Sequence, residues 1–298
     1  MTDLPPVGES PKKPPVRLVV FDFDDTLYDW IGHFVPALEA MITAAAPLLQ
    51  TSAPALREQL KAVHERYGNT EQPFALLETE SAQRLFGDLP RGEQRLALAP
   101  AFDTFDHIRK RTLQLYDDVL PTLTRLQQER VLLAGYSAAP SVNLAKRIKM
   151  LELADSFSRI YAAPFAGKPY PGMSDGFEED FDIIETERPK PDAATIPRIA
   201  RDFAVAPGEA LFVGDSIASD IEPAIVGGAR AALLRRGASS GKDWLPGLLR
   251  VSHRRAETRA DSVALDDAAL DQVPVLENLH QLWDHFTFTS HDDPPCRK

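Results

Sequence analysis

The chain has 298 residues, of which 44% are hydrophobic and 26% charged, and its formal net charge is -11. This length allows one large domain or a core with a second module, with enough apolar surface to fold without disulfide or metal staples. The acidic balance argues against a nucleic-acid polymer as the main ligand, because phosphate backbones are bound by a surplus of Lys and Arg.

The single cysteine, Cys296, excludes an intramolecular disulfide and favours a reducing compartment. Residues 1–15 are rich in proline, which predicts a disordered arm, and they lack the apolar run that a signal peptide needs. No stretch approaches the ~20 apolar residues of a membrane span. We therefore expect a soluble, cytoplasmic protein with no membrane partner.

The first predicted strand is Val16–Phe21, a nearly continuous apolar run with β-branched residues, as in strands buried on both faces. It ends abruptly at Asp22. Three later runs have the same character, and the first two also stop at a polar residue: 131–136 before Ser137, 210–214 before Asp215, and 230–234.

No strand pattern occurs between residues 30 and 116. Breaks near 51–52, 68–69 and 87–90 divide this stretch into about four predicted helices, at 31–50, 53–67, 72–86 and 91–115. The stretch is far longer than an ordinary crossover between parallel strands. We therefore interpret 30–116 as an inserted, all-helical cap domain.

Helical patterns at 122–129, 141–153 and 192–203 separate the later strands. Strands that alternate with helices predict an α/β fold with a Rossmann-like parallel sheet. The segment 161–187 has no clear periodicity and is predicted to form a long loop or a hairpin-like insertion, whereas 275–286 has the pattern of a last amphipathic helix. The predicted core comprises 16–29 and 117–289. Disorder is expected from Thr287 onward, and 290–298 is predicted to be a disordered tail.

Polar residues end three of the predicted strands, and ligands of parallel sheets bind at the carboxyl ends of the strands. Asp22, Ser137 and Asp215 should therefore meet at one edge, with Asp24 and Asp220 close by. Two carboxylates ~4 Å apart repel each other by roughly 4 kcal/mol at an effective dielectric near 20, so this group predicts a bound cation. Oxygen-only ligands favour a hard divalent ion, Mg²⁺, over a transition metal.

These residues also carry a resemblance. The sequence resembles the haloacid dehalogenase-like hydrolases, in their phosphatase branch, because the four family motifs occur in order along the chain. They are Asp-x-Asp-x-Thr at 22–26, a Ser or Thr after a strand at Ser137, a Lys before a helix at Lys190, and Gly-Asp-x4-Asp at 214–220. The helices of 30–116 resemble the family's helical cap.

The resemblance implies that Asp22 attacks phosphorus and forms an aspartyl-phosphate. Asp24 would protonate the leaving oxygen and then activate the water that hydrolyses the intermediate. An Asp with an ordinary pKa near 3.9 is only about 0.1% protonated at pH 7. Neighbouring carboxylates, burial or substrate must therefore raise the pKa of Asp24.

The resemblance also assigns the remaining residues. Ser137 and Lys190 would bind the phosphoryl oxygens, and Thr26 would bind phosphate or orient Asp24. The metal ligands would be Asp22, the backbone carbonyl of Asp24, Asp215 and, through a water, Asp220. Asp220 would alternatively support Lys190.

Two departures from the family pattern bear on these assignments. Ala138 stands after the second-motif Ser, where related branches commonly have Asn, which affects how a substrate would be oriented. The gap between Ser137 and Lys190 is long, and Lys168 within it is the alternative third-motif lysine, although no helix pattern follows it.

The sequence therefore predicts a magnesium-dependent phosphatase that acts on a small phosphorylated metabolite, such as a nucleotide or a sugar phosphate. Other reactions on the same scaffold remain open, namely a phosphomutase, a phosphonate hydrolase that would use a cap lysine such as Lys61 or Lys110, or a dehalogenase. The presence of Asp24 argues against a dehalogenase, because dehalogenases of this superfamily lack the acid/base Asp. A non-catalytic binding or regulatory protein on this scaffold is the alternative from another class.

Overall fold

The structure, a computed structural model, describes residues 15–165, 183–236, 242–252 and 267–291. Within these ranges seven strands form one sheet in the order β4-β3-β2-β1-β5-β6-β7, and every pairing is parallel. This confirms the predicted α/β fold with a Rossmann-like parallel sheet. The strands are β1 Leu18–Phe21, β2 Leu132–Pro140, β3 Arg159–Ala163, β4 Ile183–Glu185, β5 Ala210–Gly214, β6 Arg230–Leu234 and β7 Val275–Leu276.

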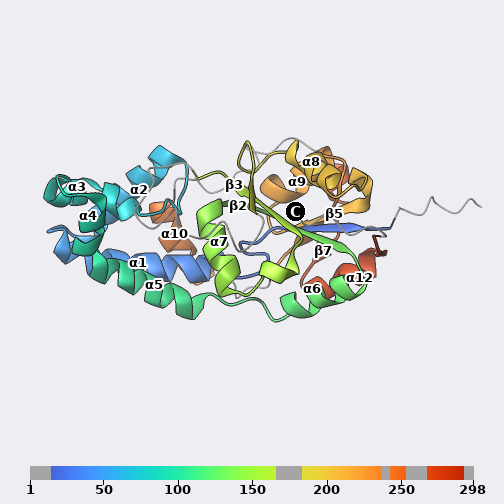
Figure 1. The fold of residues 1–298 in the computed structure, drawn as a ribbon, viewed down its shortest axis with the longest axis horizontal. Helices are drawn as coiled ribbons and strands as arrows, with labels where there is room; N and C mark the ends of the chain where they lie inside the picture. The colour runs from blue at the N-terminus through green and yellow to red at the C-terminus, as the bar shows by residue number, and fades with distance from the viewer. Residues whose placement is uncertain (1–14, 166–182, 237–241, 253–266, 292–298) are drawn as a thin grey trace, which may run out of the picture.

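Helices cover both faces of the sheet (Figure 1). The helices beside the sheet are α6 Val119–Gln128, α7 Ser141–Met150, α8 Thr195–Asp202, α9 Glu222–Val226 and α12 Leu282–His285. Successive β1 residues alternate between two hydrophobic clusters, because side chains of a strand point to opposite faces in turn. Val19 and Phe21 pack with α6, α7 and α12, whereas Leu18 and Val20 pack with α8 and α9.

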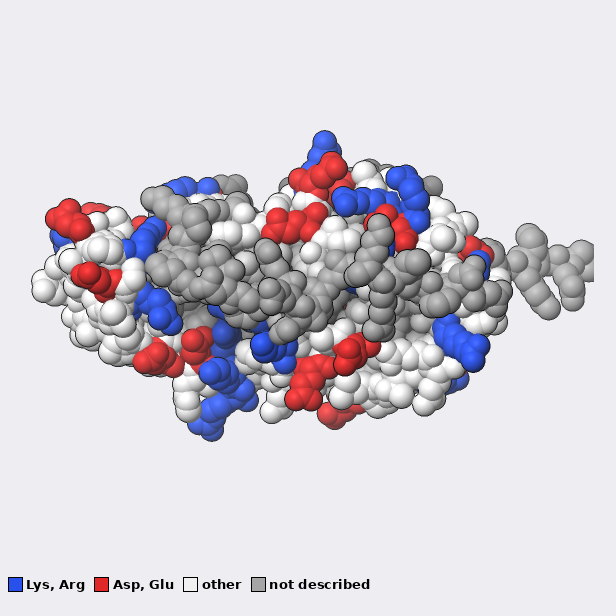
Figure 2. Space-filling view, viewed as in Figure 1, with Lys and Arg blue, Asp and Glu red and all other residues white. Residues whose placement is uncertain are grey.

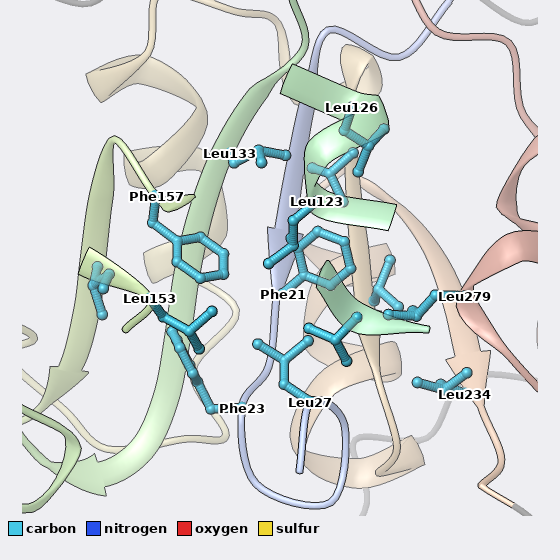
Figure 3. Close-up of a cluster of buried hydrophobic side chains, with 14 of the residues drawn as sticks. Phe21, Phe23, Leu27, Leu123, Leu126, Leu133, Leu153, Phe157, Leu234 and Leu279 are labelled. Atoms are coloured by element: carbon cyan, nitrogen blue, oxygen red, sulfur yellow. The ribbon is translucent and has the colours of Figure 1, made fainter. Parts of the chain in front are cut away.

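The cluster on the α6 side fixes the loop that follows β1. Phe21, Phe23 and Leu27 all point into it, and they meet Leu123 and Leu126 of α6 and Phe157 (Figure 3). The Phe23 and Phe157 ring centroids lie 5.3 Å apart. Phe23 also needs Gly135 opposite it, since a Cβ there would lie 2.3 Å from the Phe23 ring.

A separate hydrophobic cluster holds the helices of the predicted cap together. They are α1 Trp30–Leu48, α2 Ala53–Tyr67, the 3₁₀ helix η1 Ala75–Glu78, α3 Glu80–Phe86, α4 Arg91–Ala97 and α5 Ala99–Thr112. Asp29 caps α1 by accepting a hydrogen bond from Gly32 N at 2.7 Å. Figure 1 shows these helices to the left of the sheet.

A later segment also packs on this cluster. Helix α10, Leu245–Val251, contributes Val251 to it, and His64 Nδ1 of α2 lies 2.7 Å from the Val251 carbonyl oxygen. The range 117–289, which we predicted to belong wholly to the core, therefore includes a segment whose packing partners are cap helices.

Several elements differ from those predicted. The expected helix 91–115 is divided at Leu98, since Pro100 fits only the first turn of a helix and so begins α5. The expected helix 72–86 becomes η1 and α3, with Thr79 as the cap of α3. The described ends of 161–187 belong to strands β3 and β4, which are parallel and so do not form a hairpin with each other, and residues 166–182 between them lie outside the described residues.

Near the C-terminus the predicted helix 275–286 is wrong in its first half. Val275 and Leu276 form the edge strand β7, and only then do the 3₁₀ helix η7, Leu279–Gln281, and the short α12 follow. Residues just beyond are also bonded, because Val16 N donates to Thr287 O at 2.7 Å and His291 N to Arg130 O at 3.1 Å. Disorder from Thr287 is therefore wrong as far as residue 291. The predicted arm up to residue 14 and the tail 292–298 lie outside the described residues.

By length and composition alone, α1 could cross a membrane, which the sequence analysis did not anticipate. Half of its apolar window is buried inside the protein, where Val35, Ile42 and Ala45 belong to the helical cluster. The buried central helix of a globular domain has the same composition, so this observation alone assigns no membrane.

Helix α6 offers a matched test of the core. We expect Leu126→Ala, at a fully buried position, to lower the free energy of unfolding by about 2–5 kcal/mol, because it removes apolar contacts and leaves a cavity. Leu120→Ala on the same helix should cost little, since Leu120 is 51% exposed. Urea denaturation measures both, and equal losses would contradict this account of the core.

Candidate active site

The register of the sheet brings three of the predicted site residues to one edge. Phe21 of β1 pairs with Gly135 of β2 and with Val213 of β5. Asp22 is therefore level with Tyr136 of β2 and Gly214 of β5, and Ser137 and Asp215 are the next residues along those two strands. The Asp22 backbone N–H also donates to the Val213 carbonyl oxygen at 2.9 Å, which extends the ladder to the nucleophile position.

Lys190 joins this edge from the loop between β4 and α8. Its ammonium group donates to Asp22 Oδ1 at 2.6 Å and to Asp220 Oδ1 at 2.7 Å, and its side chain is 1% exposed. The rings of Tyr136 and Phe212 lie 4.8 and 5.0 Å from the same nitrogen. The structure thus brings the candidate third-motif lysine to Asp22, whereas Lys168 lies outside the described residues.

Asp220 depends on the glycine of the fourth motif. A Cβ on Gly214 would lie 2.4 Å from the Asp220 carboxylate, so only glycine leaves room for it. The other Asp220 oxygen, Oδ2, accepts a hydrogen bond from Ser216 N at 3.1 Å. Asp220 is therefore held from two sides, with Oδ1 bound to Lys190.

Asp24 has a different set of partners. Its Oδ1 accepts a hydrogen bond from the Tyr28 hydroxyl at 2.6 Å, and Arg147 Nη2 lies 3.4 Å from the same oxygen. Arg147 is buried and also donates to Glu71 Oε1 at 2.5 Å. Tyr28 and Arg147 thus hold Asp24, the contact that the sequence analysis gave to Thr26.

The two predicted hydroxyl residues are both buried at the edge. Thr26 Oγ1 donates to Asp22 Oδ2 at 3.3 Å. Ser137 Oγ accepts from Ala139 N at 3.0 Å, which leaves its own proton available for donation. Ala138, the departure from the family pattern, lies between the two residues of this turn.

Acidic groups outnumber the lysine here. Burial raises the pKa of Asp22 to about 8 even though Lys190 opposes the rise, and the charges of Asp220 and Asp24 add to it. Loss of hydration raises the pKa of Asp215 well above its usual range, again with Asp220 and Asp22 adding to it. The pKa of Lys190 is raised too, since the two carboxylates outweigh its own burial. Burial of the carboxylates and a surplus of negative charge together account for these directions.

Burial also raises the pKa of two other aspartates in the first motif. For Asp24 the charge of Arg147 opposes the rise, and Glu71 adds to it. For Asp25 the pKa reaches about 7. Asp25 Oδ1 accepts from Trp30 N at 2.9 Å, so it ties the loop to the start of α1.

The carboxylates fit a hard cation. One oxygen each of Asp22, Asp215 and Asp220 lie within 4.8 Å of one another, and Asp215 is the most exposed residue of the three. Oxygen ligands with one open side are the donor set that Mg²⁺ prefers. The surplus of negative charge is a second, independent reason for a cation at this place.

Three contacts in or near the site were not predicted, those of Arg147, Glu71 and Arg236. A signal existed for Arg147, which lies three residues after Leu144 on the buried face of α7, where an arginine is unusual. Arg236 lies two residues beyond β6 and donates to the Thr26 carbonyl oxygen at 2.8 Å, so the strand-end argument could have found it. Glu71 lies in a loop and gives no such signal.

With this geometry described, known proteins supply a comparison. The family model of the haloacid dehalogenase-like hydrolases matches residues 16–228, more than half of the chain. The chain belongs to this family. It is therefore a hydrolase, and phosphatases occur among its relatives.

Two curated relatives of this haloacid dehalogenase-like hydrolase are phosphatases. The chain is 27% identical over 226 residues to glyceraldehyde 3-phosphate phosphatase of Methanopyrus kandleri, which covers 74% of this chain and 85% of that protein. It is 35% identical over 127 residues to enolase-phosphatase E1 of Frankia alni, over 42% of this chain and 46% of that protein. Of solved structures, 2-haloacid dehalogenase from Pseudomonas syringae pv. Tomato matches with a TM-score of 0.55 and 21% identity, over 90% of this chain and 97% of that one. That likeness supports the fold alone.

The raised pKa values make a prediction for the metal-free protein. Asp22 and Asp25 have folded-state pKa values of about 8 and about 7, against 3.8 for an ordinary Asp, so between these values the folded state binds more protons than the unfolded state. We expect the free energy of unfolding in EDTA to fall as pH rises from about 4 to about 8. Urea unfolding across this range measures it.

Two variants serve as controls for this pH dependence. Asp22→Asn should flatten the decline, because it removes one of the titrating groups. Asp117→Asn, at an exposed position in the loop before α6, should leave the decline as it is. A free energy of unfolding that stays level or rises over this range would contradict the raised pKa values of Asp22 and Asp25.

Proposed function

We propose that this hydrolase is a magnesium-dependent phosphatase that cleaves a small phosphomonoester through an aspartyl-phosphate on Asp22. The observation that supports this most is that two carboxylates of one loop, those of Asp22 and Asp24, have different bonding partners. Asp22 shares a buried lysine with Asp220, whereas Asp24 has Tyr28 and Arg147 as partners. Different surroundings allow one carboxylate to remain a nucleophile while the other carries a proton.

The reaction has two halves. In the first, an oxygen of Asp22 forms a bond to phosphorus while the ester bond breaks, and Asp24 gives its proton to the leaving oxygen. In the second, Asp24 takes a proton from a water molecule, whose oxygen attacks the phosphorus and restores the Asp22 carboxylate. Burial favours the protonated Asp24 that the first half needs.

Donors for the transferring phosphoryl oxygens are available beside Asp22. An ammonium group has three donor hydrogens, and Lys190 uses two of them on Asp22 and Asp220. The third, with the Ser137 hydroxyl, would stabilise charge that develops on the phosphoryl oxygens. Thr26 would hold Asp22 in place through their hydrogen bond rather than contact the phosphate.

A magnesium ion would be held by Asp22, Asp215 and the backbone carbonyl of Asp24, with Asp220 supporting it through a water or through Lys190. When bound, the ion supplies positive charge beside the phosphoryl group and compensates the carboxylates. The named activities of the two phosphatase relatives also support a small phosphorylated metabolite as the substrate class.

Phosphate release from a panel of nucleotide, sugar and aliphatic phosphomonoesters tests the proposal. We expect release that requires Mg²⁺ and falls by at least about 10³-fold in Asp22→Asn, because the nucleophile is lost. Asp117→Asn should retain activity. Phosphate release indifferent to EDTA or to Asp22→Asn would overturn the mechanism, and halide release from 2-chloropropionate without any phosphate release would favour the dehalogenase alternative.

Binding of the ion is tested apart from catalysis. Mg²⁺ at about 100 times its dissociation constant should raise the free energy of unfolding by about 2.7 kcal/mol, because it binds the folded state only. Thermal denaturation with and without Mg²⁺ measures this gain. We expect Asp215→Asn to lose most of it and Asp117→Asn to keep it, and an equal gain in both variants would place the ion elsewhere.

A further inference from the structure

A cavity lies between the cap helices and α7, and it reaches the active site. It has a volume of about 140 Å³, and α1, α2, α4, α5 and α7 all contribute to its wall. Arg147 lines it and lies 3.4 Å from Asp24, the residue that would protonate the leaving oxygen. The part of the substrate beyond the ester oxygen would therefore enter this cavity.

The wall of the cavity is basic although the chain as a whole is acidic. Among the described residues, four cationic side chains line it, Arg95, Arg109, Lys146 and Arg147, against two carboxylates. Figure 2 shows Lys and Arg side chains gathered near the end of α5, the helix that carries Arg109. A local surplus of cations in a chain of net charge -11 indicates an anionic ligand.

Buried hydrogen-bond donors on the wall of the cavity also indicate an anionic ligand. Gln72 Nε2, Arg109 Nε and Arg147 Nε are buried without a hydrogen-bond acceptor among the described residues. Gln72 is 5% exposed and Arg147 2%. Buried donors are normally paired, since an unpaired one costs about 1–3 kcal/mol, so these three indicate a ligand rich in oxygen atoms.

Charges of one sign lie close together in the cavity, as they do at the sheet edge, but here they are positive. Burial lowers the pKa of Lys146, and the like charges of Arg109 and Arg95 lower it further, while Asp106 opposes them. Burial also lowers the pKa of Arg109, although Asp106, 3.0 Å away, opposes the effect, and Arg147 adds to it. These cations are near enough to repel one another, and an anion among them would relieve that repulsion.

We propose that this cavity binds the leaving group of the phosphomonoester, and that this leaving group carries a second anion, a carboxylate or a phosphate, held by Arg109 and Lys146. The inference rests on the proposed phosphatase function, which it makes more specific. Phe74, Phe102 and Phe105 supply an apolar wall for the carbon chain between the two anions. The donor groups of Gln72 and Arg147 would bind oxygen atoms of the leaving group nearer the phosphate.

The test uses a series of phosphorylated hydroxy acids with chains of two to six carbon atoms, each compared with its primary amide. The acid and the amide have nearly the same shape and differ in charge. We expect kcat/KM for the acid to exceed that for the amide by about 10- to 100-fold at the length that fits, because charge-assisted hydrogen bonds replace neutral ones. Alkanediol bisphosphates of the same lengths show whether the second anion is a phosphate instead.

Two variants and one control identify the residues. Arg109→Gln and Lys146→Gln should each reduce the preference for the acid over the amide by about tenfold. Lys110→Gln is the matched control, because Lys110 is exposed, lies next to Arg109 on α5 and does not line the cavity. The inference is overturned if, at every length, kcat/KM for the acid and for the bisphosphate is about equal to that for the amide. It is also overturned if the preference for the acid over the amide is unchanged in both variants.

Binding separates this inference from the proposed function. Calorimetry with Asp22→Asn measures the affinity for the acids, amides and bisphosphates without turnover. If no ester is hydrolysed by the unaltered protein, the phosphatase proposal fails, yet tighter binding of the anionic compounds would still support the cavity as their site. If the protein hydrolyses the esters but binds the acids, amides and bisphosphates with equal affinity, the phosphatase proposal stands and the proposal of a second anion is overturned.

Discussion

The site depends on one buried lysine between two carboxylates. Lys190 has lost its hydration, which is costly for an ammonium group, and its bonds to Asp22 and Asp220 compensate for that loss. To place both acceptors, the sheet must bring the end of β1 beside the end of β5, and Gly214 must leave room for Asp220. The arrangement of the edge thus follows from the need to pair a single desolvated charge.

One lysine does not balance the carboxylates around it. Asp215 adds a further negative charge at the open side of the edge, and burial together with this surplus raises the pKa values of Asp22 and Asp215. A cation at that side would lower both pKa values and keep Asp22 ionised, which a nucleophile requires. The same surplus that destabilises the metal-free site would therefore give a divalent ion its affinity.

The apolar runs in the sequence were enough to predict the part of the site that lies at the ends of buried strands. Asp22, Ser137 and Asp215 each follow or end such a strand, so their meeting at one edge follows from parallel topology. Lys190 lies in a loop, and only the resemblance to a known family selected it. Strands β4 and β7 were missed because they have only three and two residues. Strand β3 has five, as many as β5, and was missed because most of it lies in a segment without clear periodicity.

Arg147 shows why the remaining residues could not be predicted. Its partners, Asp24 and Glu71, come from the loop after β1 and from the cap, which are distant from α7 in the sequence. Only the packing of the cap against α7 brings the three together, so no periodicity along the chain encodes the contact. This arginine is also where the two charged regions meet, the acidic edge of the sheet and the basic wall of the cavity. A ligand with an anion at each end would satisfy both regions at once, the phosphate beside Asp22 with its cation and the second anion among the arginines. Specificity would then be determined by the distance between two charges, a quantity fixed by how the cap sits on the sheet.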